Sequence, residues 1–448
     1  MKIYLKEIRE RYPEYDIINF NEEIFFENIN HDSRVKLSNA LFIPIIGKNF
    51  DGHDFITNSF ENGCIVSLVQ KDHYRNVDYG KSIILVDDVM RGLVDIVKLI
   101  RGKISVPIVA ISGSTGKTTT REMLATILSS KGKVLNSDRN FNTLWGNAQI
   151  LCKYENENYV VLELGMDRKG EIMEQCEAIN PDMGILLNVG YAHAMQLGGI
   201  ENVYLAEKEL ADYLLKNSRT TFINIDDERL SRMREESKVK TYGLSSKAEV
   251  MASKVKVTQE GTSFDINIGG STYNGRLNIF GKGYVYNALS ALSVCRYLGM
   301  DMANSLSALE QYSGFKGRFE IVKKSEDLIV INDAYNANPT SMDMSLETFN
   351  TLWGARSDWQ KILVLGDMKE LGDITQQMHS ELGKKVSKMG VQKVYYVGEY
   401  YEYFKIGAHI HSLNTLVEDL KDQIFEKKSV ILFKASNSIN LQSVIEML

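Results

Sequence analysis

The stretch Val109-Ala-Ile-Ser-Gly-Ser-Thr-Gly-Lys-Thr-Thr-Thr120 decides how the centre of this chain folds. Val109 to Ile111 are typical of a buried strand end, and an amphipathic pattern starts at Thr118. Two glycines between them let backbone N–H groups turn inward, and a helix N-terminus favours an anion. We therefore predict a phosphate-binding loop. Its predicted contacts are Gly113, Ser114, Thr115, Gly116, Lys117, Thr118 and Thr119.

Within this loop, Lys117 is expected to reach the outer phosphates and Thr118 a metal ion. The spacing is GxxGKT, without the leading glycine of the full GxxxxGK[ST] pattern. The alternative is an ordinary Gly/Ser turn between a strand and a helix. The helical pattern that continues from Glu122 to Leu128 favours the nucleotide site.

Composition narrows the class of protein. The 448 residues are enough for about three domains, with 44% hydrophobic and 25% charged residues. Fifty-two basic against 58 acidic residues give a formal charge of −6, without a long basic run. That balance argues against a nucleic-acid or membrane-surface partner and is compatible with a metal-bound polyphosphate.

The cysteines and the N-terminus indicate in which cellular compartment the protein is found. Cysteines at positions 64, 152, 176 and 295 are too widely spaced for a CxxC motif and too few for a disulfide framework. Met1 to Lys6 carry no apolar signal region, and no run of 18 apolar residues occurs. We expect a cytoplasmic protein with reduced, buried thiols, no membrane insertion and a monomeric state.

Patterning predicts an α/β protein of three domains. Residues 1–104 form a small α/β N-terminal domain, residues 105–315 a central P-loop domain with a doubly wound sheet, and residues 316–448 a C-terminal Rossmann-like open sheet. Residues 248–280 alternate polar and apolar around Gly269-Gly270, which indicates an antiparallel hairpin.

Polar residues after the strands are candidates for the site. Glu163 and His193 follow two central strands, where such sheets bind ligands, and could hold Mg²⁺; the alternatives are an edge carboxylate and a structural histidine. Ser33 and Arg34 lie in a loop that could hold a second anion, although solvated turns are the simpler interpretation. In the C-terminal region, polar clusters follow strands at 332–339, 366–370 and 434–438.

Taken together, these strings resemble the Mur ligases, and within that family the MurF type, over essentially the whole chain. The resemblance rests on motifs that occur in the family's order: GSTGKTTT at 113–120, Asn140-Phe-Asn142, Glu163-Leu-Gly165, Asn188-Val with Ala192-His193, Asp333-Ala-Tyr-Asn-Ala-Asn-Pro-Thr-Ser-Met342 and Leu365-Gly-Asp-Met-Lys-Glu-Leu-Gly372. Asp32-Ser-Arg34 and Asp51-Gly-His53 are similar to the family's uridine-nucleotide-binding N-terminal domain.

The resemblance implies an ATP-dependent ligase of peptidoglycan synthesis that adds D-alanyl-D-alanine to UDP-MurNAc-tripeptide. ATP phosphorylates a peptide carboxylate, the amine attacks the acyl phosphate, and the adduct collapses to an amide, ADP and phosphate. Lys117 with one Mg²⁺ on Thr118 and Glu163 would neutralise the phosphates, and a second Mg²⁺ near His193 would hold the acceptor. Further implied nucleotide contacts are Tyr284, Asn287, Arg318, Asp333 and Asn336. Implied substrate contacts are Ser33, Arg34, Gly47, Asn140, Asn142, Asn338 and Ser341.

One departure concerns the metal site. Fourteen residues after His193 the family has a lysine that CO₂ carbamylates into an anionic Mg²⁺ ligand, and here that position is Glu207. Lys208 comes one residue late, which aims it elsewhere on a helix. We hypothesise that Glu207 replaces the carbamate as a catalytic metal ligand, so that activity does not need CO₂.

Other departures affect the substrates. Thr143 and Leu144 follow Asn142 where the MurF type has Asn-Glu, and Gly283-Tyr284 replace a His-Asn pair that addresses adenine; Tyr284 could stack instead. Two alternatives therefore stay open. One is a MurF-like ligase that joins another amino acid or amine to another carboxylate in specialised metabolism; the other is a P-loop NTPase or scaffold that does not ligate.

Overall fold

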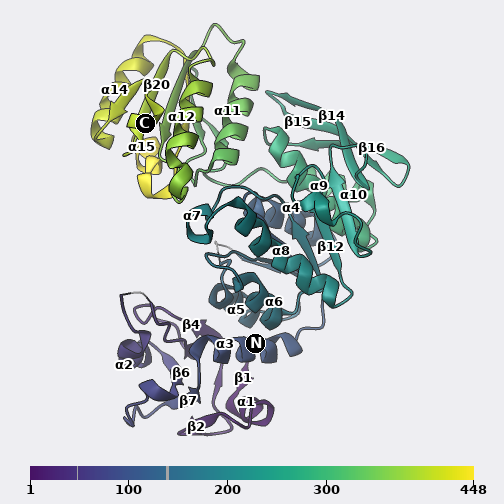
Figure 1. The fold of residues 1–448 in the computed structure, drawn as a ribbon, viewed down its shortest axis with the longest axis vertical. Coiled ribbons are helices and arrows are strands. Elements are labelled where there is room, and N and C mark those ends of the chain that lie inside the picture. The colour runs from purple at the N-terminus through teal and green to yellow at the C-terminus, as the bar shows by residue number, and fades with distance from the viewer. Residues whose placement is uncertain (48, 138–140) are drawn as a thin grey trace.

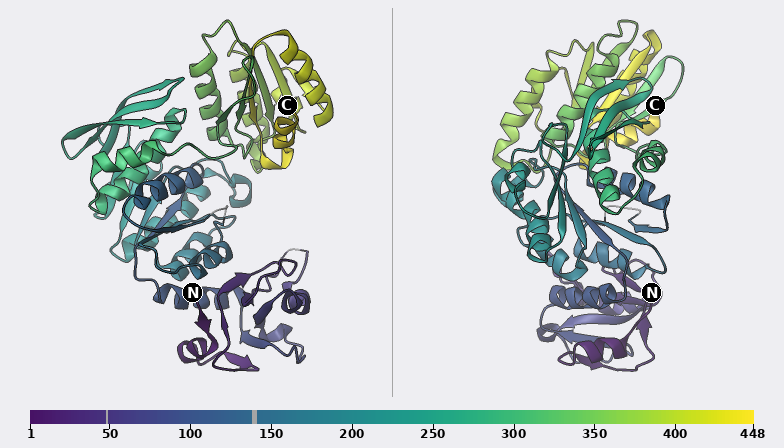
Figure 2. Two further views of the ribbon diagram at one scale, coloured as in Figure 1. Left: turned by 180° about the vertical axis from the view of Figure 1, so that it is seen from behind. Right: turned by 90° about the vertical axis from the view of Figure 1, so that its right-hand side faces the viewer.

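The computed structural model describes residues 1–47, 49–137 and 141–448. The chain forms an N-terminal, a central and a C-terminal unit, each with its own main sheet. In Figure 1 the N-terminal unit lies at the bottom, the central unit in the middle and the C-terminal unit at the upper left, and the two views of Figure 2 keep that order along the long axis. This architecture confirms the α/β class and the three predicted units. The limits at 104 and 315 remain predictions.

The N-terminal unit has a five-stranded sheet in the order β2-β7-β6-β5-β4, in which β2 alone is antiparallel to its neighbour. Its strands are β2 (Asp16–Ile18), β4 (Asn28–Asn30), β5 (Ala40–Phe42), β6 (Cys64–Gln70) and β7 (Ser82–Val86), beside a small pair of β1 (Ile3–Tyr4) and β3 (Phe25–Phe26). Its helices are α1 (Leu5–Arg11), α2 (Ile56–Glu61) and α3 (Val89–Gly102). The Asp88 side chain caps α3 by accepting a bond from the Arg91 N–H at 2.7 Å.

The central unit has a nine-stranded sheet in the order β16-β15-β14-β13-β12-β11-β8-β10-β9, parallel from β9 to β14. The strands are β8 (Ile108–Ser112), β9 (Val134–Asn136), β10 (Tyr159–Glu163), β11 (Met183–Leu186), β12 (Thr220–Asn224), β13 (Val239–Gly243), β14 (Val250–Thr258), β15 (Gly261–Ile268) and β16 (Ser271–Leu277). The helices are α4 (Lys117–Ser129), α5 (Leu144–Cys152), α6 (Glu171–Ile179), α7 (Ala194–Leu197), α8 (Ile200–Lys216), α9 (Lys282–Tyr297) and α10 (Met302–Glu310).

Two features of this sheet follow from the sequence. All five residues of β8 are buried, as a strand covered on both faces requires. The predicted hairpin is confirmed: β14, β15 and β16 pair antiparallel, and Gly269 and Gly270 take positive φ angles of 56° and 84° at the turn.

The C-terminal unit has a six-stranded sheet in the order β17-β18-β22-β19-β20-β21, parallel except for β17. The strands are β17 (Glu320–Lys323), β18 (Leu328–Asn332), β19 (Gln360–Gly366), β20 (Lys393–Val397), β21 (Ala408–Ile410) and β22 (Ser429–Lys434). The helices are α11 (Pro339–Trp353), α12 (Thr375–Val386), α13 (Tyr401–Phe404), α14 (Leu413–Glu426) and α15 (Leu441–Met447).

The units share part of their packing. One apolar core runs from Ile3 in the N-terminal unit to Val239 in the central unit, with α3 packed against α6. All four cysteines are buried and free, and burial raises the pKa of the Cys152 thiol to about 12. Within the described part of the chain, every helix is too short or too polar to span a lipid bilayer.

Candidate active site

The Gly113–Thr118 loop connects β8 to α4 at the carboxyl end of the central sheet. Gly113 and Gly116 have φ angles of 137° and 92°, which side chains other than glycine rarely adopt. A Cβ on Gly113 would lie 2.9 Å from the Leu187 Cβ, and one on Gly116 would lie 2.7 Å from the Asn287 Nδ2. Both the backbone angle and the close neighbours therefore require glycine at these two positions.

Asn188, which follows β11 in the same sheet, holds the loop in place. The Thr115 N–H donates to the Asn188 Oδ1 at 3.0 Å, and the Asn188 Nδ2 donates back to the Thr115 carbonyl at 2.9 Å. The Lys117 Nζ donates to the Gly113 carbonyl at 2.6 Å. The lysine is thus folded over its own loop, where a phosphate group could take the place of that carbonyl.

Thr118 and Glu163 form a fitting donor set for Mg²⁺. The Thr118 hydroxyl donates to the Glu163 Oε2 at 3.1 Å, and both residues are buried and line one cavity. Neighbouring ligands of an octahedral ion with bonds of about 2.0–2.1 Å are separated by about 2.9 Å. The two oxygens are therefore close to the spacing that one Mg²⁺ would impose.

The other side of Glu163 is held by residues that the motifs did not point to. The Arg121 Nη1 pairs with the Glu163 Oε1 at 3.0 Å, and the Arg121 side chain is fully buried. The Asn147 Nδ2 donates to the Glu163 backbone carbonyl at 2.9 Å. A signal for Arg121 was present in the sequence, since it lies at helical spacing with the buried Leu124 and Leu128.

Glu207 lies beneath the loop on α8. It is buried, at 3% exposure, its Oε2 accepts the Ser112 hydroxyl at 2.5 Å, and it also accepts from the Gly113 N–H. Burial raises the pKa of its carboxyl, against the lowering effects of Lys117, Ser112 and His193. Glu207 is not among the residues described as lining the cavity, so its role as a metal ligand remains a prediction.

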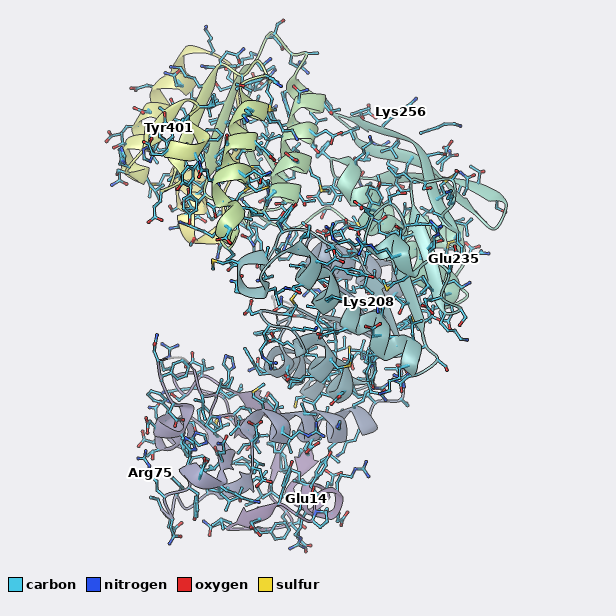
Figure 3. The ribbon with its side chains drawn as sticks, in the orientation of Figure 1. Glu14, Arg75, Lys208, Glu235, Lys256 and Tyr401 are labelled. Atoms are coloured by element: carbon cyan, nitrogen blue, oxygen red, sulfur yellow. The ribbon has the colours of Figure 1, made fainter. Side chains whose placement is uncertain are left out.

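Lys208, by contrast, points away as predicted: it pairs with Asp212 on the partly exposed side of α8. Figure 3 marks its position in the central unit.

His193 connects the central and C-terminal units. It precedes α7, and its Nδ1 lies 3.1 Å from the Asp167 Oδ1 and 3.3 Å from the Glu370 Oε2. The Met195 N–H donates to the Glu370 carbonyl at 3.3 Å. The polar cluster at 366–370 thus contacts the predicted second metal position from the opposite unit.

A cavity of about 640 Å³ lies between these two units. From the C-terminal side Arg318 reaches the loop, its Nη2 donating to the Thr118 Oγ1 at 3.3 Å. Asp333 and Lys434 form an ion pair of 2.7 Å in the cavity wall, and the lysine is 2% exposed. Lys369, Glu370 and Ser436 also line the wall; they belong to the polar clusters at 366–370 and 434–438, for which the sequence assigned no individual roles.

Most of the remaining predicted residues line the same cavity, and several also have structural partners. The Tyr284 hydroxyl donates to the Arg318 carbonyl at 2.9 Å, and the Asn287 Nδ2 donates to the Gly116 carbonyl at 3.0 Å. Asn338 caps α11 by accepting the Ser341 N–H at 2.8 Å. The predicted residues along this wall are Ser114, Thr115, Gly116, Lys117, Thr118, Thr119, Asn142, Glu163, His193, Tyr284, Asn287, Arg318, Asp333, Asn336, Asn338 and Ser341.

The predicted substrate residues of the N-terminal unit lie elsewhere. Ser33, Arg34 and Gly47 are not among the described residues that line the cavity. The exposed Arg34 guanidinium pairs with Asp32 at 2.7 Å and lowers the pKa of that carboxyl to about 2. Asn140 lies outside the described residues.

Comparison with known proteins decides the family. The Mur ligase middle domain matches residues 111–295, and the Mur ligase glutamate ligase domain matches residues 317–437. The UDP-N-acetylmuramoyl-tripeptide–D-alanyl-D-alanine ligase of Bacillus subtilis is 33% identical over 438 residues, which cover 95% of this chain and 93% of that protein. The chain belongs to the Mur ligase family.

Solved Mur ligases share its architecture. MurF from Acinetobacter baumannii superposes with a TM-score of 0.89 at 25% identity, covering 100% of this chain and 98% of the other. MurF from Thermotoga maritima, solved in complex with ADP, superposes with a TM-score of 0.82 at 28% identity, covering 94% and 96%. The loop, the carboxylate and the interdomain cavity described above therefore belong to a Mur ligase.

Proposed function

We propose that this Mur ligase joins D-alanyl-D-alanine to UDP-MurNAc-tripeptide with ATP, through an acyl phosphate. The supporting observation is the cavity in which the Gly113–Thr118 loop, Glu163 and His193 face Arg318 and Asp333 of the following unit. Full-length similarity to the B. subtilis enzyme of that name supports the substrate pair. ATP is an intracellular substrate, which favours the cytoplasm; the monomeric state remains a prediction.

The chain's own residues have separate tasks in this reaction. Lys117 and the loop N–H groups bind the outer phosphates, and Thr118 with the Glu163 Oε2 would hold Mg²⁺. Mg²⁺ bound there supplies positive charge against the charge that accumulates as a carboxylate oxygen attacks the γ-phosphorus and ADP leaves. The amine nitrogen then attacks the acyl carbon, the bond from that carbon to the phosphate oxygen breaks, and the nitrogen gives up a proton as the amide forms.

The structure supports catalysis mainly through the positioning of the reacting groups. Both steps join anionic or bulky groups, so alignment and a preorganised positive field lower the barrier most. Arg318 reaches Thr118, and Glu370 reaches His193, across the boundary between the two units. Closure of the C-terminal unit would therefore complete the site and exclude water.

Glu207 has a separate role in this proposal. A buried carboxylate beside Ser112 and Lys117 is costly to keep unless it has a task. We propose that it supplies the negative charge behind the loop that a carbamylated lysine provides elsewhere in the family. A glutamate cannot lose this charge when CO₂ is removed.

ADP release measured with and without each substrate tests the function. Turnover that requires both UDP-MurNAc-tripeptide and D-alanyl-D-alanine, with one amide product per ADP, supports the proposal. Turnover with other carboxylates or amines only would make the chain a ligase of specialised metabolism. ADP release that depends on neither substrate would make the chain an NTPase.

A further inference from the structure

We infer that Arg121 is a positioning residue that restricts Glu163 to metal binding through one oxygen, and so makes the nucleotide site prefer Mg²⁺ to Ca²⁺. The inference rests on the nucleotide and metal site of the proposed function. It concerns the selectivity of that site and does not depend on which acid and amine are joined.

The carboxylate of Glu163 is divided between two neighbours. Its Oε1 lies 3.0 Å from the Arg121 Nη1, and its Oε2 accepts the Thr118 hydroxyl at 3.1 Å. The side chains of Arg121 and Glu163 are 0% and 3% exposed, so water hardly competes for this pair. One oxygen faces the cavity beside Thr118, and the other faces the guanidinium.

The backbone of Glu163 is held as firmly as its side chain. The Asn147 Nδ2 donates to the Glu163 carbonyl at 2.9 Å and to the Gln175 Oε1 at 3.1 Å. The Gln175 Nε2 donates to the Gly165 carbonyl at 2.7 Å, two residues further along. These buried amides hold the backbone at the end of β10, and with it the position from which the Glu163 side chain reaches Thr118 and Arg121.

One available oxygen favours a small ion. Mg²⁺ takes six ligands in near-ideal octahedral geometry at about 2.0–2.1 Å and is usually bound through single carboxylate oxygens, phosphates and water. Ca²⁺ takes six to eight oxygens at about 2.3–2.6 Å and often uses both oxygens of a carboxylate. By pairing with the Oε1, Arg121 keeps that oxygen on the side of the guanidinium and so disfavours the second bond that Ca²⁺ would use.

The charge of Arg121 has a second consequence for the site. The Arg121 guanidinium faces two carboxylates, because its Nη2 also pairs with the Glu122 Oε1. Arg121, Glu122 and Glu163 together carry one net negative charge. The phosphates of the nucleotide must therefore supply most of the attraction for the cation. Metal selectivity is therefore best measured on the nucleotide complex.

The test is ADP binding by titration calorimetry, in saturating MgCl₂ and in saturating CaCl₂. We expect ADP to bind wild type more tightly with Mg²⁺. In Arg121→Gln the Mg²⁺-supported affinity should fall by about tenfold, as for other partners that orient a metal ligand, while the Ca²⁺-supported affinity falls less. Arg121→Lys keeps a cation and should retain most of the preference.

Arg101→Gln is the control, because Arg101 on α3 is also an arginine of low exposure, 13%, that pairs with a carboxylate, Asp182, at 2.9 Å. It should lower stability without changing the ratio of the two affinities. An unchanged ratio in Arg121→Gln, or an equal change in Arg101→Gln, would overturn the inference.

A crystal structure of wild type with Mn²⁺ and ADP tests the same point without a variant, should Arg121→Gln fail to fold. Coordination by the Glu163 Oε2 alone supports the inference, and coordination by both oxygens refutes it. Wild type that binds ADP but forms no amide would refute the proposed function and leave this selectivity intact. Wild type that binds no ADP with either ion would refute both.

Discussion

The substitution Glu207→Gln tests how the charge of Glu207 affects activity and stability separately. Glutamine keeps the shape of the side chain and removes its charge from a buried site. Its carbonyl oxygen can still accept from the Gly113 N–H, and the Ser112 hydroxyl can turn to the Leu164 carbonyl, 3.0 Å away. No buried donor near residue 207 therefore has to lose its partner.

The two expected effects have opposite signs. Because burial raises the pKa of Glu207, the charged form costs stability, and the neutral amide should raise the free energy of unfolding by about 1 kcal/mol. That gain corresponds to a rise in Tm of about 2–4 °C for a unit of this size. Loss of the charge behind Lys117 should lower kcat by about 10- to 100-fold.

Amide formation followed by mass spectrometry, together with thermal unfolding, measures both effects. Glu209→Gln is the control: Glu209 is buried on the same helix but accepts from the N–H groups of Gly170 and Met173, away from the loop. It should keep the wild-type kcat. A Glu207→Gln variant with wild-type kcat, or one that loses activity and stability together, would refute this role for the carboxylate.

Three further outcomes are expected. Removing CO₂ and bicarbonate should leave the activity of wild type unchanged, and a loss that bicarbonate restores would contradict the role of Glu207. Lys434→Met removes the buried cation that pairs with Asp333, which is 14% exposed and keeps the bond from the Phe319 N–H, and should lower the free energy of unfolding by about 2 kcal/mol in urea. Lys428→Met breaks an exposed pair with Asp327 and should change it by less than about 0.5 kcal/mol. Burial alone would raise the pKa of Asp367, but bonds from Lys369, Tyr396 and the N–H groups of Glu399 and Tyr400 hold it below its ordinary value. A depressed folded pKa adds stability above the ordinary Asp pKa, which is lost as pH falls toward the folded pKa, so Asp367→Asn should flatten the acid limb of a stability–pH curve; an unchanged limb would contradict this.

Local pattern was sufficient for most of the fold. The buried run of β8 and the two glycines after it predicted a strand, a tight turn and a helix, because few other conformations satisfy that order. Alternation around Gly269-Gly270 predicted the hairpin for the same reason. The parallel sheets then placed Glu163 and the Gly113–Thr118 loop at one edge, where the structure has them.

For the site, the sequence predicted only those features that depend on the spacing of residues along the chain. The position of Glu207 on α8 was predicted from its distance to His193, but its depth beneath the loop depends on how α8 packs against β8. Arg121 was missed because a helix pattern does not say which buried charge has a partner on another strand. The capping bond between Asn338 and Ser341 likewise gives a structural reason for two residues that motif reasoning assigned to substrate.

The most direct measurement is a crystal structure of the enzyme with Mg²⁺, a non-hydrolysable ATP analogue and UDP-MurNAc-tripeptide. The mechanism predicts the γ-phosphate at Lys117, the ion on Thr118 and the Glu163 Oε2, and the peptide carboxylate facing that phosphate near His193. An empty Gly113–Thr118 loop, or a nucleotide bound in another cleft, would contradict it.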